Sequence, residues 1–417
     1  MKKTKVLWFT NTPSLYKRDA NGYNGGGWIE SLEASMAKEE QIDLGISFFS
    51  NDRTDVFKVK QNDVTYYPIS KNNTFKNKLL KEIFPRRNDR LELDMFKEVV
   101  HDFEPDIIHV FGSEASFGLL SLHLKIPLVI HVQGILTPYL NAWFPPGTYK
   151  LDYLNLLSPK KIINSFRNLN RFKYNASREI KILKNCKNFQ GRTTWDKDVT
   201  RLYSPNAKYF YCSEILREAF YKAKPWKPTE NKVIKIISTI SKVEYKGFDL
   251  ILKSAKLLKE NTNIKFEWEV YGISEYPFWE KKIGHLPKDL NINLMGVADQ
   301  YHIIDAMKNS DVFVHPSYID NSPNSVCEAQ MVGIPVISTN VGGISSLISN
   351  YETGILIPAN DPYTLVSKIL ELTSNNILSL SLSLEARKCA FLRHDVETIL
   401  NQNLSVYQSM IEYVDQG

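Results

Sequence analysis

The chain has 417 residues, which is too long for one ordinary hydrophobic core, and we expect two domains of roughly 200 residues each. Its hydrophobic content of 43% and charged content of 24%, with 19 Gly and 19 Pro, exclude a disordered or fibrous protein. The net charge is only +6, from 52 basic and 46 acidic residues.

The N-terminal residues MKKTKVLWFTNT contain only four apolar residues before polar residues return, so they lack the apolar core of a signal peptide. No stretch approaches the roughly 18 uninterrupted apolar residues of a membrane span. We therefore expect a cytoplasmic protein. The four cysteines lie far apart without paired spacing, which predicts neither a disulfide framework nor a zinc site.

Residues 5–9 (KVLWF) form an apolar run, followed by a loop that ends in Gly26 and Gly27 and by a helical pattern from Trp28. This order predicts a strand, a glycine loop and a helix. Backbone amides of these glycines can approach an anion closely because no Cβ intervenes; a flexible loop tip is the alternative. The spacing in residues 22–30 (GYNGGGWIE) does not match G-x-G-x-x-G, which argues against an NAD-dependent dehydrogenase.

Two later runs of the first half repeat the strand pattern. Residues 105–112 (PDIIHVFG) and 126–134 (IPLVIHVQG) are rich in β-branched side chains and end in glycine, as expected of buried parallel strands. We therefore predict a parallel α/β domain over residues 1–222.

A basic segment follows at residues 150–187. It contains ten Lys or Arg residues against Asp152 and Glu179, a charge of +8 that exceeds the excess of the whole chain. Apolar residues are interleaved at roughly helical spacing, which has two interpretations: a helix lying on an anionic membrane surface, or an amphipathic helix packed on the first domain with a solvated basic face. No known nucleic-acid-binding motif accompanies the segment, and we expect no nucleic-acid partner.

Residues 196–198 (DKD) have the acid-x-acid pattern of metal-dependent transferases. So short a pattern arises often by chance, and we interpret Asp196 and Asp198 as surface residues. We therefore predict no metal site and no cofactor.

Residues 222–228 (KAKPWKP) have two prolines, three lysines and no periodicity, so we interpret them as a connection between domains. Strand and helix patterns then alternate again, which predicts a second α/β domain over residues 229–394. Residues 395–417 keep a three-and-four apolar spacing and predict a long amphipathic helix that needs a surface to cover.

The most informative segment is residues 315–343, HPSYIDNSPNSVCEAQMVGIPVISTNVGG. Ser322 is a suitable N-cap, Pro323 is favoured at the first helical position, and Gly333 can end the helix. The predicted helix start presents backbone N–H groups that suit a phosphate group. Glu328 on this helix can accept hydroxyl hydrogen bonds from a ribose, and Asp320 can accept them from a sugar ring. We expect the Glu328 side chain to have little packing role.

Asp320 and Glu328 are separated by seven residues and precede EAQMVGIPVISTNVGG. In this spacing and context the chain resembles the retaining glycosyltransferases of the large group 1 family (glycosyltransferase family 4). The resemblance extends over essentially the whole chain and is far stronger in the C-terminal half. It implies two Rossmann-like parallel-sheet domains that face a cleft (the GT-B fold), with the C-terminal helix crossing back to the first domain. One departure is Asp320, where the family usually has Glu.

The resemblance also implies the roles of individual residues. Glu328 would hold the ribose, Asp320 would contact hydroxyls of the donor sugar, and His131 would reach that sugar from the first domain. The implied catalytic set is His131, Lys246 and Asp320, and the implied donor-binding set is Gly26, Gly27, Lys242, Val297, Ser322, Pro323, Asn324, Ser325 and Glu328.

Lys246, in KGFD at residues 246–249, would place an ammonium beside the donor diphosphate and stabilise the charge that grows as the leaving group departs. The family normally has an Arg five or six residues earlier, where this chain has Ile240 or Ser241. Lys242 and Arg192 are the two candidates to replace it.

The function implied is transfer of a sugar from a nucleoside diphosphate, with UDP-sugar favoured, to a glycan or lipid-linked glycan in bacterial surface polysaccharide synthesis. The nucleotide sugar would be a substrate, the anomeric configuration would be retained, and no metal would be needed. Two alternatives stay open: an inactive or regulatory GT-B subunit, and a sugar-nucleotide epimerase.

Overall fold

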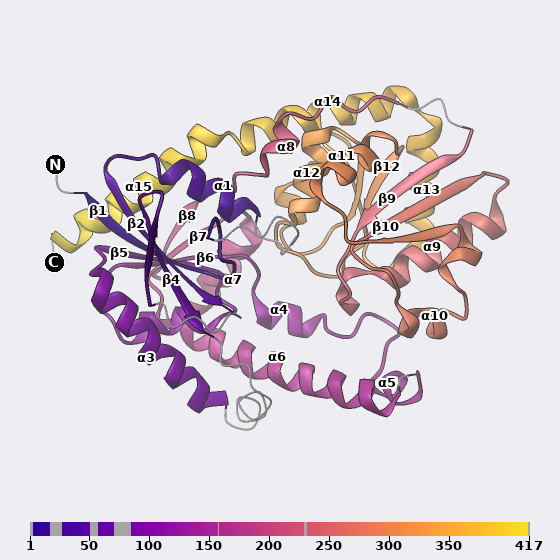
Figure 1. Ribbon diagram of the computed structural model, residues 1–417. Helices are drawn as coiled ribbons and strands as arrows, with labels where there is room; N and C mark the ends of the chain where they lie inside the picture. Colours follow the sequence, from indigo (N-terminus) through magenta and orange to yellow (C-terminus); the bar gives the residue numbers. More distant parts are fainter. Residues whose placement is uncertain are drawn as a thin grey trace. The chain divides into compact units, whose positions relative to one another are not determined.

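The computed structural model describes residues 3–16, 27–50, 57–70, 85–156, 158–228 and 232–415. They form two compact units, each built around its own sheet (Figure 1). Unit 1 consists of Met1–Thr137, Asn170–Ile215 and His394–Gly417, and unit 2 consists of Pro138–Leu169 and Leu216–Arg393.

Unit 1 contains an eight-stranded sheet in the order β3-β4-β2-β1-β5-β6-β7-β8. All neighbouring pairs are parallel except β3 and β4. The strands are β1 (Thr4–Thr10), β2 (Ile42–Ser50), β3 (Val59–Gln61), β4 (Val64–Ser70), β5 (Ile107–Phe111), β6 (Leu128–His131), β7 (Asn188–Gly191) and β8 (Lys208–Tyr211). The predicted parallel strands are therefore present, and their unbroken apolar runs follow from burial on both faces.

The helices around this sheet are α1 (Gly27–Met36), α3 (Pro85–Phe103), η1 (Ser116–Leu122), α7 (Thr194–Tyr203) and α15 (Val396–Asp415). The long helix α6 (Pro159–Asn185) has its second half in this unit, where Ile182 and Leu183 join the core beneath α3 and η1. The chain passes from unit 1 to unit 2 within the short helix α4 (Leu136–Asn141).

The C-terminal helix α15 belongs to unit 1, which confirms the prediction that it crosses back to the first domain. Its buried Tyr407 hydroxyl accepts a hydrogen bond from Trp8 Nε1 at 3.0 Å and lies 2.7 Å from His109 Nδ1. Asn403, one turn earlier, accepts a hydrogen bond from Gln190 Nε2 at 3.0 Å. The amphipathic helix therefore covers one face of the first sheet, where it contacts residues of the interior strands β1, β5 and β7.

Unit 2 contains a six-stranded, wholly parallel sheet in the order β11-β10-β9-β12-β13-β14. The strands are β9 (Ile234–Thr239), β10 (Phe266–Tyr271), β11 (Ile292–Gly296), β12 (Val312–His315), β13 (Val336–Thr339) and β14 (Ile355–Ile357). The helical segments are α5 (Lys150–Leu156), α8 (Glu218–Tyr221), η2 (Glu244–Lys246), α9 (Phe248–Asn261), α10 (Pro277–Ile283), η3 (Pro287–Leu290), α11 (Gln300–Lys308), α12 (Asn324–Val332), η4 (Ile344–Ser346), α13 (Pro362–Ser374) and α14 (Asn376–Arg393).

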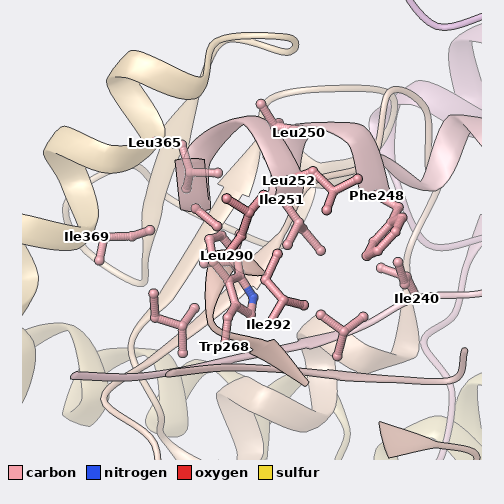
Figure 2. Packing of buried hydrophobic residues seen from close by; sticks show 14 of the residues in the cluster. Ile240, Phe248, Leu250, Ile251, Leu252, Trp268, Leu290, Ile292, Leu365 and Ile369 are labelled. Carbon is pink, nitrogen blue, oxygen red and sulfur yellow. The ribbon is translucent and has the colours of Figure 1, made fainter. Parts of the chain in front are cut away.

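The core on one face of this sheet lies beneath α9. Figure 2 shows Phe248, Ile251 and Leu252 of this helix together with Trp268 of β10 and Leu365 of α13. All five side chains are almost completely buried. This packing fixes the start of α9, and with it the KGFD turn, relative to the end of β9.

The units differ from the predicted domain ranges at residues 138–169, which pack with unit 2. Tyr153 of α5 is buried and stacks on Phe278 of α10, with 4.7 Å between ring centroids. Lys282 forms an ion pair of 2.8 Å with Asp152. These contacts are distant in sequence, so the local pattern gave no sign of them.

The interpretation of residues 222–228 as a connection also needs revision. Trp226 is buried in unit 2, and its Nε1 donates a hydrogen bond of 2.7 Å to the carbonyl oxygen of Ser310. The lysines of this stretch remain at the surface, but the tryptophan makes it part of the unit 2 core. None of the helices in the described ranges combines the length and apolar character that a membrane span requires.

Candidate active site

The candidate site of unit 2 lies at the carboxyl ends of β9 and β12, which are neighbours in the sheet. η2 follows β9 and carries Lys246, while the loop after β12 carries Asp320. Ligands of open parallel sheets bind beyond the carboxyl ends of the strands. The predicted Asp320 and Lys246 therefore lie where such a sheet places its ligand.

Asp320 is buried in a cluster of cationic and polar groups. Its Oδ2 lies 2.5 Å from Lys246 Nζ, 3.2 Å from His315 Nε2 and 3.4 Å from Ser317 Oγ. Burial raises the pKa of the Asp320 carboxyl, but Lys246 and His315 outweigh this effect and hold the pKa well below its usual range. The structure thus brings together an ionised carboxylate and a lysine that the sequence separates by 73 residues.

Two glycines allow the loops of this site to approach each other. At Gly247 (φ +76°) a Cβ would overlap the carbonyl oxygen of Pro316, and at Gly342 (φ +53°) it would overlap the carbonyl oxygen of Asp320. Gly343 N donates a hydrogen bond of 3.0 Å to that same Asp320 oxygen. The glycines of KGFD and VGG are therefore required both by their left-handed backbone and by close packing.

Asp249, the last residue of KGFD, holds the two loops together from within the core. Its buried carboxylate accepts a hydrogen bond of 2.8 Å from Tyr318 Oη and pairs with Lys253 at 2.7 Å. Tyr318 N in turn donates to the carbonyl oxygen of Tyr245 at 2.7 Å. Asp249 therefore positions the loop that presents Asp320.

We expect Gly342→Ala to displace the Asp320 loop, because its Cβ cannot coexist with the Asp320 carbonyl. The variant should lose roughly 2–4 kcal/mol of stability, or lose the contact between Asp320 and Lys246. Both the left-handed backbone of residue 342 and the overlap of its Cβ with the Asp320 carbonyl oxygen oppose the alanine. Chemical denaturation measures the loss of stability. Gly284→Ala is the matched control. Gly284 (φ +78°) also has a left-handed backbone, but the space around its Cβ position is open, so alanine there adds backbone strain without any overlap. Equal losses in both variants would contradict the role given to Gly342.

Glu328 lies on α12, and its carboxylate is buried against Arg217. Arg217 Nε and Nη2 donate hydrogen bonds of 3.0 and 2.7 Å to Glu328 Oε1. Burial raises the pKa of Glu328, an effect that Arg217 opposes. The expectation that Glu328 has little packing role is therefore wrong, and Arg217, just before α8, is a site residue that the sequence reasoning missed. The signal in the sequence was weak, because a single Arg 111 residues away belongs to no motif.

The start of α12 differs from the prediction. The N-cap is Pro323, whose extended backbone (φ −66°, ψ 122°) delays the helix to Asn324, and no side chain caps it. Ser322 is buried in the preceding loop and is not the N-cap. Asn324 and Ser325 lie in the first turn, so their amides occupy the helix start that the prediction assigned to the donor.

Two further predicted donor residues lie at the surface. Lys242 is about half exposed, and its Nζ lies 2.9 Å from Glu275 Oε1. Val297, after β11, is 69% exposed. Their roles stay predictions.

His131 ends β6 in unit 1 and is buried between aromatic rings, 5.3 Å from Trp28 and 5.7 Å from His109 by ring centroids. Burial lowers its pKa well below the usual range, so the imidazole is neutral at physiological pH. Gly27 opens α1, whereas Gly26 lies outside the described residues.

Arg192 belongs to unit 1 and is engaged there. Its Nη1 lies 2.5 Å from Glu214 Oε2, and both side chains are buried. A guanidinium committed to a buried carboxylate is costly to release, which weakens the case for Arg192 as the replacement for the family's donor-site Arg.

The prediction that Asp196 is a surface residue is wrong, because its side chain is completely buried. It lies in the first turn of α7, where its backbone N–H donates to the N-cap Thr193 and its carboxylate accepts hydrogen bonds from Arg192 N and Tyr209 Oη. Asp198 is exposed and pairs with Arg201. Asp196 thus belongs to a buried hydrogen-bond network at the start of α7, and Asp198 belongs to a surface ion pair. Across the described ranges no three His, Cys, Asp or Glu side chains are grouped so that they could hold a metal ion.

The segment that contains the whole Lys246, Asp320 and Glu328 arrangement matches a family model. The match to "Glycosyl transferases group 1" covers residues 218–389. This segment is a group 1 glycosyltransferase domain. Arg217 lies one residue before the matched part of this group 1 domain, and residues 138–169 of unit 2 lie outside it.

Relatives of the chain include the putative colanic acid biosynthesis glycosyltransferase WcaL of Escherichia coli, which is 27% identical over 33% of this chain and 35% of its own length. A UDP-Gal:alpha-D-GlcNAc-diphosphoundecaprenol alpha-1,3-galactosyltransferase of Escherichia coli is 35% identical over 22% of this chain and 24% of its own. The matches with the curated relatives span less than half of each relative's length.

Solved structures resemble the chain over nearly its whole length. Sucrose-phosphate synthase from Thermosynechococcus elongatus superimposes with a TM-score of 0.71 at 15% identity, covering 99% of this chain and 100% of that one. Anabaena HepE in complex with UDP-glucose gives a TM-score of 0.63 at 15% identity, covering 97% and 99%. With the two parallel-sheet units, these neighbours give the chain the predicted GT-B fold.

Proposed function

We propose that the protein transfers a sugar from a nucleoside diphosphate sugar, with a UDP-sugar as the favoured donor, to a glycan or lipid-linked glycan. The observation that carries this proposal is the Asp320–Lys246 pair of 2.5 Å at the carboxyl ends of β9 and β12, with Glu328 on the next helix. A HepE structure with UDP-glucose supports the donor class, since HepE shares the fold.

Lys246 acts on the donor diphosphate. An ammonium has three N–H donors, and the contact with Asp320 uses one of them, so two remain for phosphate oxygens. As the bond between the anomeric carbon and the phosphate oxygen breaks, negative charge grows on the departing diphosphate, and Lys246 stabilises it.

Asp320 and Glu328 orient the two ends of the donor. Asp320 accepts hydrogen bonds from sugar hydroxyls, and Glu328 accepts them from the ribose. The acceptor oxygen attacks the anomeric carbon on the face that the phosphate leaves, and its proton passes to the departing phosphate oxygen. The product keeps the configuration of the donor, and catalysis is mainly orientation and electrostatics.

The biological setting we propose is bacterial surface polysaccharide synthesis. The relatives' names support it, because one concerns colanic acid biosynthesis and another a diphosphoundecaprenol acceptor. A lipid-linked acceptor requires the enzyme to work at a membrane surface.

The function is tested by following nucleotide release from UDP-, GDP- and ADP-sugars in the presence of a bacterial lipid-linked glycan extract. We expect release from one donor class, undiminished by excess EDTA, because Lys246 supplies the charge stabilisation that a metal would otherwise give. Asp198→Ala should be equally active. Activity that EDTA abolishes and magnesium or manganese restores would disprove the metal-independent mechanism. The absence of nucleotide release from all three donors would disprove the function.

We also propose that residues 150–187 bind an anionic membrane surface. Nine of the ten Lys and Arg residues of this segment are exposed, and the tenth, Arg178, pairs with Asp89. Its two acids are occupied, since Asp152 pairs with Lys282 and Glu179 is buried. Four large apolar side chains, three toward the N-terminal end of the segment and one just before it, are 47–68% exposed: Leu151, Leu154, Ile163 and the preceding Tyr149. Exposed apolar groups among cations suit anionic lipid head groups.

Removing two of these cations should weaken membrane binding. Each basic residue near an anionic surface contributes about 1 kcal/mol, so Lys160→Gln with Lys161→Gln should weaken binding to vesicles that contain phosphatidylglycerol by about 30-fold. Co-sedimentation measures it. The control is Lys256→Gln with Lys388→Gln, which removes one partly exposed and one exposed cation elsewhere in unit 2. Equal binding by both double variants would contradict the assignment to this segment.

A further inference from the structure

Tyr139 of α4 is the side chain that completes the surroundings of Asp320. It lies in residues 138–169, outside the group 1 domain, yet it packs within unit 2. Its Oη lies 3.3 Å from Asp320 Oδ1, whereas Lys246, His315 and Ser317 are all nearest the other oxygen, Oδ2. The two oxygens of the carboxylate are thus held from different sides.

The direction of the Tyr139 hydrogen bond follows from its second partner. Asn321 N donates to Tyr139 Oη at 3.2 Å, so the hydroxyl accepts from the backbone and has its own single proton left for Asp320. Burial, together with the Asp320 charge, raises the pKa of Tyr139 well above its usual range, so the hydroxyl keeps that proton.

The ring of Tyr139 is fixed as well. It meets the ring of Tyr245 edge to face, with 5.2 Å between centroids, and Tyr245 precedes Lys246. Tyr139 is itself buried. One side chain therefore supports both the loop of Asp320 and the turn of Lys246.

We propose that Tyr139 is a positioning residue of the donor-sugar site: its hydroxyl fixes the rotation of the Asp320 carboxylate so that the free lone pairs of this group meet the hydroxyls of the donor sugar. The inference rests on the proposed function, because it assigns Asp320 to the sugar. It adds that the sugar site takes a positioning group from outside the group 1 domain.

Tyr139→Phe tests this, since it keeps the ring on Tyr245 and removes only the hydroxyl. Calorimetric titration should show UDP binding unchanged and UDP-sugar binding weakened about tenfold, which corresponds to about 1.4 kcal/mol. UDP alone lacks the sugar that Asp320 contacts. The matched control is Tyr351→Phe, which removes a tyrosine hydroxyl that donates to the carboxylate of Glu371 at 3.0 Å, on the exposed surface of the same unit.

A second variant background gives an independent test. In an Asp320→Asn protein, adding Tyr139→Phe should change UDP-sugar affinity by less than about twofold, because the two residues act as one unit. Additive losses would overturn the proposal. So would equal weakening of UDP and UDP-sugar, tighter UDP-sugar binding, or a Tyr139→Phe chain that is unfolded at the assay temperature. If the wild-type chain binds another nucleotide sugar and no UDP-sugar, the same comparison is made between that donor and its nucleotide. If the wild-type chain binds no nucleotide sugar at all, the proposed function is overturned, and this inference with it.

Discussion

Lys246→Ala is expected to lower turnover by about 10²–10³-fold while weakening donor binding far less. The charge that Lys246 meets is largest when the glycosidic bond breaks, so its removal costs the transition state more than the ground state. The contact with Asp320 adds to the loss of turnover. Lys246 lies 2.5 Å from the buried Asp320 carboxylate and lowers its pKa, so the variant also disturbs the group that contacts the donor sugar. Steady-state kinetics with the matching nucleotide sugar separate kcat from KM.

The control for this variant is Lys256→Ala, which removes a partly exposed lysine of α9 whose partner Glu260 lies 3.8 Å away at the surface. It should keep wild-type kinetics. Thermal unfolding must accompany the assay, because loss of the ion pair between Lys246 and the buried Asp320 also lowers stability. A rise in KM with unchanged kcat would make Lys246 a binding residue only.

Glu328→Gln is expected to weaken nucleotide binding by about 10- to 100-fold, because a neutral amide replaces the carboxylate that accepts the ribose hydroxyls. The same side chain neutralises Arg217 in the folded protein. Glu328→Ala would break this largely buried ion pair with Arg217, at a cost of about 3–5 kcal/mol, so the alanine variant tests folding more than binding. Gln keeps a hydrogen-bond acceptor for Arg217 and isolates the charge.

Asp89→Asn is the matched control for Glu328→Gln. Asp89 pairs with Arg178 at 2.9 Å in unit 1, and both pairs are similarly buried. The two variants should lose similar stability in chemical denaturation, but only Glu328→Gln should lose nucleotide affinity in calorimetric titration. Unchanged affinity in Glu328→Gln would exclude the ribose role.

Much of the fold was predictable from local sequence. The β-branched runs that end in glycine became β5 and β6, and the apolar spacing of residues 395–417 became α15, because burial on a strand or on one helix face leaves a periodic pattern. The acid spacing and KGFD likewise predicted Asp320 and Lys246, which the structure places 2.5 Å apart.

The remaining site residues depend on contacts that no local pattern records. Arg217 reaches Glu328 across 111 residues, and Tyr139 reaches Asp320 across 181. The prediction for Asp196 failed for a related reason: an acid in the first turn of a helix looks the same in sequence whether it faces solvent or, as here, is buried and hydrogen-bonded to Arg192 N and Tyr209. Residue type and spacing therefore predicted which side chains carry the chemistry of the site, but not which residues these side chains contact.

The last residues of the chain complete unit 1, and this order matters during synthesis. α15 supplies Tyr407, the partner of Trp8 and His109, but it leaves the ribosome only after Leu216–Arg393, a stretch of about 180 residues, has been made. At about 5–20 residues per second, unit 1 waits on the order of 10–40 s with that part of its core uncovered. The last segment of unit 2 is already synthesised by then, so unit 2 can finish folding before unit 1 has received the helix that completes its core.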